Sequence, residues 1–402
     1  MQALLAALTL QAGWNSALVA VGAGLLGLSA GAAGVFIFLR KRALISDAAT
    51  HATLPGLALA FIVMAWADGD GRWLPGLLIG SALSAGFGLW LVEAMTRRTR
   101  LSEDAAIGAV LSVAFGVGIV LLTVIQTLPF GRQAGLDGFL LGSTAGMLES
   151  EARLIAALGL LTALAVFALR RPMTLVAFDP GYAETSGLDI RRVDLAMMGL
   201  ALAVTVVGLK VVGLILIVAL LITPAATARF WTDRAHLMVP LSAGLGGVSA
   251  YLGAAISASA PALPTGPVVV LVAFALFMLS LLVSPLRGVA ARALRAWRFQ
   301  RRVHRRQGLL AVARAEPIFE RRTLRLLRRE GLIRGDGAPT RAGRAAAAKA
   351  LRDEARWAAL RREAGDPTLL ELDDGLTPID RALTPDQISA LDRRLGPPQA
   401  VA

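Results

Sequence analysis

The sequence predicts an all-α protein whose larger part is a polytopic membrane bundle of about nine helical spans, followed by a small cytoplasmic domain. Hydrophobic residues make up 56% of the 402 residues and charged residues only 17%, and a soluble protein of this size needs more charge to cover its surface. From Arg287 onward there are 25 Lys/Arg and 14 Asp/Glu, so about +11 of the net charge of +13 lies there. This segregation of charge indicates a membrane domain with a basic soluble tail.

Long apolar runs define the spans. A helix needs about 20 apolar residues to cross the hydrocarbon core of a bilayer. The break at Gly208–Lys210 is the weakest boundary, and without it the count falls to eight. The nine expected spans are residues 16–39, 49–66, 74–95, 105–128, 154–169, 193–209, 211–230, 237–258 and 266–283.

The connecting loops predict the orientation. Arginine and lysine gather in alternate loops, at 40–42, 97–100, 170–192, 229–234 and in the tail from Arg287. The intervening loops, at 68–72, 132–150, around Lys210 and at 259–265, carry few positive charges. Because short cytoplasmic loops hold the excess of basic residues, we expect a multi-pass protein of the bacterial cytoplasmic (inner) membrane, with its N-terminus outside and its C-terminus in the cytoplasm.

Three domains are expected: a transmembrane domain at 1–286, a basic juxtamembrane helix at 287–308 and a cytoplasmic extension at 309–402. Within the second, arginines alternate with Leu294, Trp297, Phe299 and Val303, a pattern typical of an amphipathic helix on an anionic lipid surface. Nucleic acid is the alternative partner for so basic a segment. The neighbouring span favours membrane lipids, and DNA is not expected as a partner.

Asp47 and His51 are the candidate metal-binding residues. They lie four residues apart at the start of the second span, a spacing that places both on one helix face. The chain has no cysteine, which excludes thiolate ligands, and a carboxylate with an imidazole suits a divalent transition metal. The residues alone leave a second interpretation open, in which Asp47 caps the helix and His51 bonds to a neighbouring helix.

Two proline kinks accompany this pair. Pro55-Gly56 follows in the same span and Thr223-Pro224 lies in the seventh. A proline removes one backbone hydrogen bond and bends its helix, and membrane proteins tolerate this where the helix lines a cavity. We expect both kinks to border the metal pathway, although each is also compatible with ordinary packing.

A short helix is expected in the loop at residues 177–189. Asp179 before Pro180 is a helix start signal and Gly187 is a stop signal. Such an isolated helix, carrying Tyr182 and Glu184, would be a docking element for another subunit, while the alternative is an ordinary surface turn.

These segments together resemble the zinc/manganese/iron permease family of ABC transporters. Its Asp-x-x-x-His-Ala-x-x-Pro-Gly signature corresponds here to Asp47, His51, Ala52, Pro55 and Gly56. A second signature corresponds to Gly213, Leu216, Ala219, Leu220, Leu221, Pro224, Ala225 and Ala228. The segment with Phe178, Asp179, Pro180, Ala183 and Gly187 resembles the family's ATPase-coupling loop, to which Tyr182 and Glu184 also belong. The resemblance covers residues 19–285.

The resemblance implies the function and the partners. It implies a permease subunit that moves Mn(II), Zn(II) or Fe(II) inward, paired as a homodimer or with a related permease. It also implies two ATP-binding subunits and an extracytoplasmic metal-binding protein. The chain lacks a phosphate-binding loop, so it is not itself an enzyme. No permanently bound cofactor is expected, ATP being hydrolysed on the partner.

The C-terminal extension resembles a different family. Residues 309–395 are similar to the winged-helix fold of iron-dependent repressors, which some permeases of this family carry. The repressors' metal ligands are altered here: the matching segments read Glu354-Ala-Arg-Trp-Ala and Asp380-Arg-Ala-Leu-Thr, which lack two histidines and a glutamate. We therefore expect a regulatory or docking module without a functional metal sensor.

Three other functions compete with metal import. A permease for metal chelates (siderophore or cobalamin) needs a wide, aromatic-lined path and no Asp/His pair. A membrane-anchored DNA-binding regulator needs a single anchoring span rather than nine. A secondary transporter is expected to show pseudo-symmetric repeats of interrupted helices, and we find no convincing repeat in the sequence.

Overall fold

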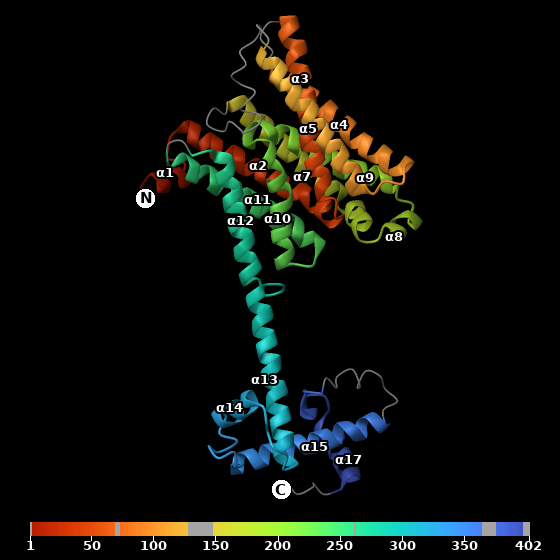
Figure 1. The fold of residues 1–402 in the computed structure, drawn as a ribbon, viewed down its shortest axis with the longest axis vertical. Coiled ribbons are helices and arrows are strands. Elements are labelled where there is room, and N and C mark those ends of the chain that lie inside the picture. The colour runs from red at the N-terminus through yellow and green to blue at the C-terminus, as the bar shows by residue number, and fades with distance from the viewer. Residues whose placement is uncertain (1, 69–72, 128–147, 261–262, 364–374, 397–402) are drawn as a thin grey trace. The chain divides into compact units, whose positions relative to one another are not determined.

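The computed structural model describes residues 2–68, 73–127, 148–260, 263–363 and 375–396 (Figure 1). These residues form two compact units, at 1–289 and 290–402. The described part of the first unit consists of helices and their connections. Its helices are α1 (Gln2–Leu8), α2 (Trp14–Leu39), α3 (Ala43–Asp68), α4 (Leu74–Arg98), α5 (Glu103–Thr127), α7 (Glu149–Phe178), α8 (Pro180–Thr185), α9 (Ile190–Val212), α10 (Leu214–Trp231), α11 (Ala235–Ala258) and α12 (Thr265–Val283).

The all-α polytopic fold is confirmed. In the described ranges, eight helices are long and apolar enough to cross a membrane, namely α2, α3, α4, α5, α7, α9, α11 and α12. The apolar part of α10 is shorter, at residues 216–231. The described residues therefore contain eight full-length candidate spans and one shorter apolar helix. The end of the span expected at residue 128, and most of the loops at 68–72 and 132–150, lie outside the described residues.

The break between the sixth and seventh expected spans falls later than the sequence indicated. Helix α9 continues through Lys210 to Val212, and Gly213 separates it from α10. Gly213 has φ 82°, a left-handed conformation that glycine adopts without the steric cost of a Cβ. Beyond this break, the side chain of Ile217 packs closely against Gly208.

Helix α2 is at the centre of the first unit. It packs against α7, α9, α10 and α11, and most of its residues are buried. A Cβ at Gly27, Gly31 or Gly34 would collide with the backbone of α11 or α10. The Ser242 hydroxyl on α11 donates a 2.7 Å hydrogen bond to the Gly31 carbonyl. Small residues thus allow the backbones to approach closely, as is usual where lipid provides no hydrophobic driving force.

Helices α3, α4 and α5 lie side by side (Figure 1). Gly56 of α3 and Gly80 of α4 meet so closely that a Cβ on either would strike the other's carbonyl. On the other side, Gly118 of α5 lies against Leu54 of α3. Glycines on both neighbours therefore hold α3, which carries the candidate metal pair, between α4 and α5.

The second unit has its own apolar core. Leu309, Leu327, Ile333 and Ala347 are buried together, and Trp357 is buried against Ile379, Leu383 and Leu391. An isolated antiparallel bridge joins Ile333 to Pro339. The helices are α13 (Val289–Ala313), α14 (Arg321–Arg329), α15 (Arg341–Glu363), the 3₁₀ turn η2 (Ile379–Arg381) and α17 (Pro385–Leu395).

The expected division of the tail stays a prediction. A single helix, α13, runs across the expected boundary at 308/309, and its last turns pack into the core of the second unit through Leu309 and Ala313. The order of α14, a bridged turn and α15 is compatible with a winged helix, but it does not establish that fold. Residues 364–374 and 397–402 of the expected extension lie outside the described residues.

Candidate metal site

Asp47 and His51 occupy adjacent turns of α3 and face each other. The Nε2 atom of His51 lies 3.5 Å from the Oδ1 atom of Asp47. The Asp47 side chain is 40% exposed in the isolated chain and that of His51 is 19% exposed. The shared face predicted from the i, i+4 spacing is therefore present, and the carboxylate occupies its more accessible end.

The surroundings of His51 leave one ring nitrogen free. The ring packs edge-to-face on Phe115 of α5, with 5.2 Å between centroids. Its Nδ1 atom is buried and has no hydrogen-bond partner among the described residues. Buried polar atoms usually have partners, so Nδ1 is an exception, while the other ring nitrogen, Nε2, is the one that faces the Asp47 carboxylate.

Pro55 lies inside α3, four residues after His51, and has no N–H group to donate to the His51 carbonyl. The nearby hydroxyls bond within the helix, since Thr50 donates to the Ser46 carbonyl and Thr53 to the Thr50 carbonyl. The proline therefore removes one helical hydrogen bond in the turn that follows the pair. Gly56 has a different role, allowing close contact with α4.

A complete metal-ligand set is not present within one chain. No group of three or more His, Cys, Asp or Glu side chains suitable for a metal occurs in the residues that the structure describes. One carboxylate and one imidazole would hold a divalent ion weakly. A stronger site requires further ligands.

The second proline kink lies in a different packing environment. Pro224 is inside α10, and its ring lies 3.4 Å from the Cβ position of Gly246 on α11. The Thr227 hydroxyl donates a 2.7 Å hydrogen bond to the carbonyl of Thr223. The structure thus places Thr223–Pro224 in the contact of α10 with α11, and its link with the Asp47–His51 pair stays a prediction.

The short helix expected after Asp179 is present as α8. The Asp179 carboxylate accepts a 2.9 Å hydrogen bond from the backbone N–H of Tyr182, and Pro180 occupies the first turn. Gly187 follows with φ 82°, which ends the helix as expected. Ala183 is buried against α7 and α9, whereas Tyr182 and Glu184 are exposed. The helix is thus anchored on one side and presents polar and aromatic side chains on the other.

An ionic network that the sequence did not predict joins α7 and α9, the two helices that contact α8, to the segment before α3. Asp194 of α9 accepts hydrogen bonds from Arg40 at 2.8 Å and Arg42 at 3.1 Å. Arg40 also donates to the Val176 carbonyl near the end of α7, and Arg42 pairs with Glu103 of α5 at 3.0 Å. In the sequence, Arg40 and Arg42 indicate only the orientation of the chain. The single acid Asp194 soon after Arg191-Arg192 was the available hint of a buried partner.

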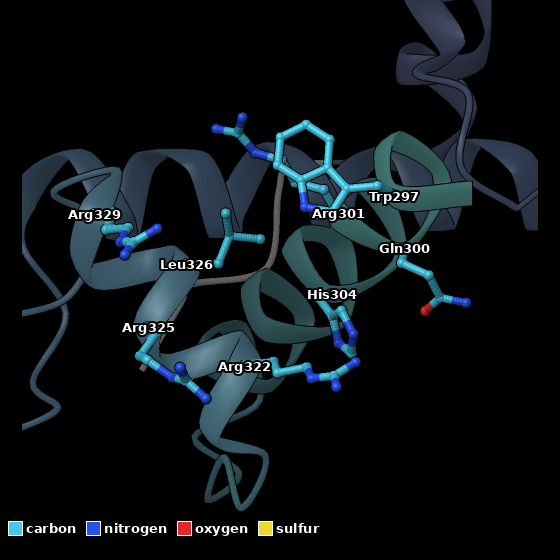
Figure 2. Close-up of a pocket in the computed structure, with 8 residues that line it drawn as sticks. All are labelled: Trp297, Gln300, Arg301, His304, Arg322, Arg325, Leu326 and Arg329. Carbon is cyan, nitrogen blue, oxygen red and sulfur yellow. The ribbon is translucent and has the colours of Figure 1, made fainter. Parts of the chain in front are cut away.

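The second unit contains a basic pocket of about 700 Å³ between α13 and α14. Trp297, Arg301 and His304 line it from α13, and the arginines of α14 line the opposite side (Figure 2). Glu330 holds Arg301 and Arg305 at 2.9 and 2.8 Å. The α14 residues in the pocket are Arg322, Arg325, Leu326 and Arg329. Such a pocket attracts anions rather than metal cations.

The fold and the site define an all-α polytopic membrane protein with an adjacent carboxylate and imidazole on a glycine-packed helix. Residues 15–284 match the family described as the ABC 3 transport family. The chain belongs to this family.

Individual relatives support the same placement. The manganese transport system membrane protein MntC of Bacillus subtilis is 40% identical over 298 residues, covering 74% of this chain and 67% of the relative. The zinc transport system membrane protein TroC of Treponema pallidum is 36% identical over 271 residues, covering 67% and 89%. The solved structure of PsaBC from Streptococcus pneumoniae in complex with Fab matches with a TM-score of 0.60 and 28% identity, over 69% of this chain and 93% of that chain.

Proposed function

We propose that this chain is the membrane-spanning permease subunit of an ABC importer that moves a divalent transition metal, Mn(II) or Zn(II), into the cell. Membership of the ABC 3 transport family and the manganese and zinc relatives support the class of transporter. The observation that carries the proposal for the ion itself is the Asp47–His51 pair.

The pair has the chemistry of a transient cation site. Imidazole suits Zn(II) and carboxylate suits Mn(II), and the carboxylate also offsets part of the ion's charge. The partial exposure of Asp47 leaves it accessible to an incoming hydrated ion. A transport site must bind strongly enough to accept the ion and weakly enough to release it, which favours few ligands from each chain.

A dimer completes the ligand set. In our proposal the partner is a second copy or a related permease, whose α3 faces this one across a shared axis. Two chains then offer two carboxylates and two imidazoles. Dimers with two-fold symmetry are the commonest oligomers, and four ligands suffice for a transient site.

ATP is hydrolysed on other chains in this proposal. The sequence contains no phosphate-binding loop, so two separate ATP-binding subunits supply the energy. Helix α8 is the proposed docking element, with Tyr182 and Glu184 exposed for the contact. Movement of α8 would reach α3 through Asp194, Arg40 and Arg42. An extracytoplasmic binding protein delivers the metal.

The basic loops support an orientation with the N-terminus outside and the C-terminus in the cytoplasm.

The chelate alternative is less well supported. A siderophore or cobalamin already satisfies its metal's coordination, so its carrier gains nothing from a carboxylate and imidazole held 3.5 Å apart. A bare ion needs replacement ligands as it loses water. The geometry of α3 therefore favours the free ion as the transported species.

Metal uptake by site variants tests the proposal. We expect both variants to assemble with their ATP-binding subunits but to lose uptake. Asp47→Asn should lower uptake on the order of a hundredfold, because intramembrane charge terms are worth about 2.5–3.5 kcal/mol, and His51→Ala should lower it because a nitrogen ligand is removed. The measurement is uptake of radioactive manganese and zinc by cells, normalised to the amount of complex in the membrane.

Asp104→Asn is the matched control. Asp104 is an exposed acid at the start of α5, so its replacement removes a carboxylate outside the site and should leave uptake unchanged. Near-normal uptake by both His51→Ala and Asp47→Asn would reduce the pair to a helix-end acid and a packed histidine.

A further inference from the structure

A groove with no lining residue from α3, the helix that carries Asp47 and His51, lies over α2 between α7 and α11. Its volume is about 1030 Å³. Ala32 and Phe36 of α2 contribute to its floor, while Val166 of α7 and Val239 and Ala243 of α11 contribute apolar walls. Both α7 and α11 are candidate membrane spans. The apolar part of the groove therefore lies within the membrane-spanning part of the first unit.

One end of this groove is strongly basic. Arg170 and Arg171 lie toward the end of α7, and Arg234 and His236 lie at the start of α11. Among the described residues, none of these three arginines forms an ion pair with a carboxylate. Asp233, the acid at this end, is already paired with Arg229 at 3.2 Å and Arg287 at 2.5 Å.

Arg170 is partly fixed at the groove's edge. Its guanidinium carbon lies 4.2 Å from the centroid of the Phe167 ring, a cation–π contact. The planar face is used by the ring, and the N–H groups at the guanidinium's edge can still donate. Guanidinium groups bind phosphate oxygens through paired hydrogen bonds, so the basic end is suited to a phosphate.

We propose that this groove binds a phospholipid with an anionic headgroup. An acyl chain occupies the apolar part beside Val166 and Ala243, and the phosphate contacts Arg170, Arg171 and Arg234 at the membrane boundary. The arrangement has the polarity of a lipid, with hydrocarbon deep in the span and negative charge at the interface. Arginines that have no carboxylate partner at the membrane boundary favour anionic over zwitterionic headgroups.

A second copy of the chain fits the groove less well. A two-fold contact through this face would bring the same patch of each protomer together. Arg170, Arg171 and Arg234 would then approach their counterparts, and like charges at short range repel. The charge at the mouth therefore favours an anionic occupant over a symmetric protein partner.

Lipid binding to the purified permease tests the inference. The protein is purified in detergent, stripped of lipid and titrated with phosphatidylglycerol or phosphatidylcholine of identical acyl chains, with binding counted by native mass spectrometry. We expect phosphatidylglycerol to bind about tenfold more tightly than phosphatidylcholine, and Arg170→Gln/Arg171→Gln to remove that preference. Ala163→Trp, which fills the groove from α7 without changing charge, should weaken binding of both lipids.

The matched control is Arg98→Gln/Arg100→Gln, which removes the same charge from the exposed C-terminal end of α4 and the turn after it, outside the groove. It should keep the preference for phosphatidylglycerol. Equal loss in both double variants would overturn the inference, because binding would then follow net charge alone. Unchanged lipid binding in the groove variants, or a change only in the permease's own oligomeric state, would also overturn it. None of these readouts depends on metal transport.

Discussion

At the scale of single residues, glycines decide how closely the helices of the first unit pack. The contact of Gly56 with Gly80 brings α3 and α4 together at the turn after His51. By contrast, Gly86 on α4 has nothing within 4 Å of its Cβ position. The same residue type is therefore essential for packing at one position and replaceable at another.

Gly56→Ala should destabilise the permease by about 1–3 kcal/mol, since the added methyl group meets backbone rather than a movable side chain. We also expect reduced uptake, because α3 and its metal pair are displaced. Gly86→Ala is the control and should be neutral or slightly stabilising through helix propensity. Thermal unfolding of the detergent-solubilised protein compares the two. Equal melting temperatures would show that α3 and α4 are not in close contact.

At the scale of elements, charge pairs connect helices far apart in the sequence. Arg40 and Arg42, between α2 and α3, meet Asp194 of α9. Arg40 and Asp194 have side chains only 16% and 15% exposed. Loss of Asp194 would leave the Arg40 charge with little solvent and no counter-ion. The free energy of unfolding then falls by more than the ion pair itself contributes to it.

Asp194→Asn should therefore lower the free energy of unfolding by about 2–3 kcal/mol, somewhat below the cost of breaking a fully buried pair. Asp189→Asn is the control on the same helix, because asparagine still caps the helix and its pair with Arg192 is exposed. In a double-mutant cycle, Arg40→Gln combined with Asp194→Asn should cost less than the sum of the single changes. Full additivity would mean that Arg40 and Asp194 do not interact.

At the scale of the whole molecule, the two units differ in what stabilises them. The first unit relies on apolar helices with close backbone contacts. The second has a small apolar core surrounded by ion pairs, among them Arg356 with Asp392 at 2.6 Å and Lys349 with Asp380 at 2.6 Å. The second unit should accordingly respond more strongly to pH.

The pKa values of three of its carboxyls are lowered. Hydrogen bonds from Arg356 lower the pKa of Asp392 and those from Lys349 lower the pKa of Asp380. For Glu330, burial opposes the shift, but hydrogen bonds from Arg305 and Arg301 outweigh it and its pKa falls. The pKa of Asp353 is raised, chiefly by burial. A lowered carboxyl pKa contributes stability above the unfolded value that is lost as the pH falls, while Asp353 acts in the opposite direction.

The segment 287–402, produced alone, should thus lose stability as the pH falls from about 5 toward 3, since three lowered carboxyls outweigh one that is raised. Far-ultraviolet circular dichroism with urea titration at each pH measures this. Asp392→Asn removes one contributor and should flatten the pH dependence. A stability that rises on acidification would indicate that Asp353 dominates.

The sequence alone determined the class of fold, the helical segments and the local geometry of two sites. Apolar length is a property of each segment by itself, because backbone groups in lipid must be satisfied within the helix. The facing of Asp47 and His51 follows from helix periodicity, and α8 follows from Asp179 and Gly187, which act over a few residues. All of these are interactions between residues close in the chain.

Only the tertiary structure decided the exact break at Gly213, the glycine contacts, the Asp194 network and the groove between α7 and α11. The last three depend on residues far apart in sequence, such as Arg40 with Asp194 or Gly31 with Ser242, whose meeting depends on how the helices pack. Lys210 illustrates the limit, since its charge indicated a loop although the backbone stays helical to Val212. Hydropathy records the preference of each residue for lipid or water, whereas packing depends on pairs of surfaces that no single segment contains.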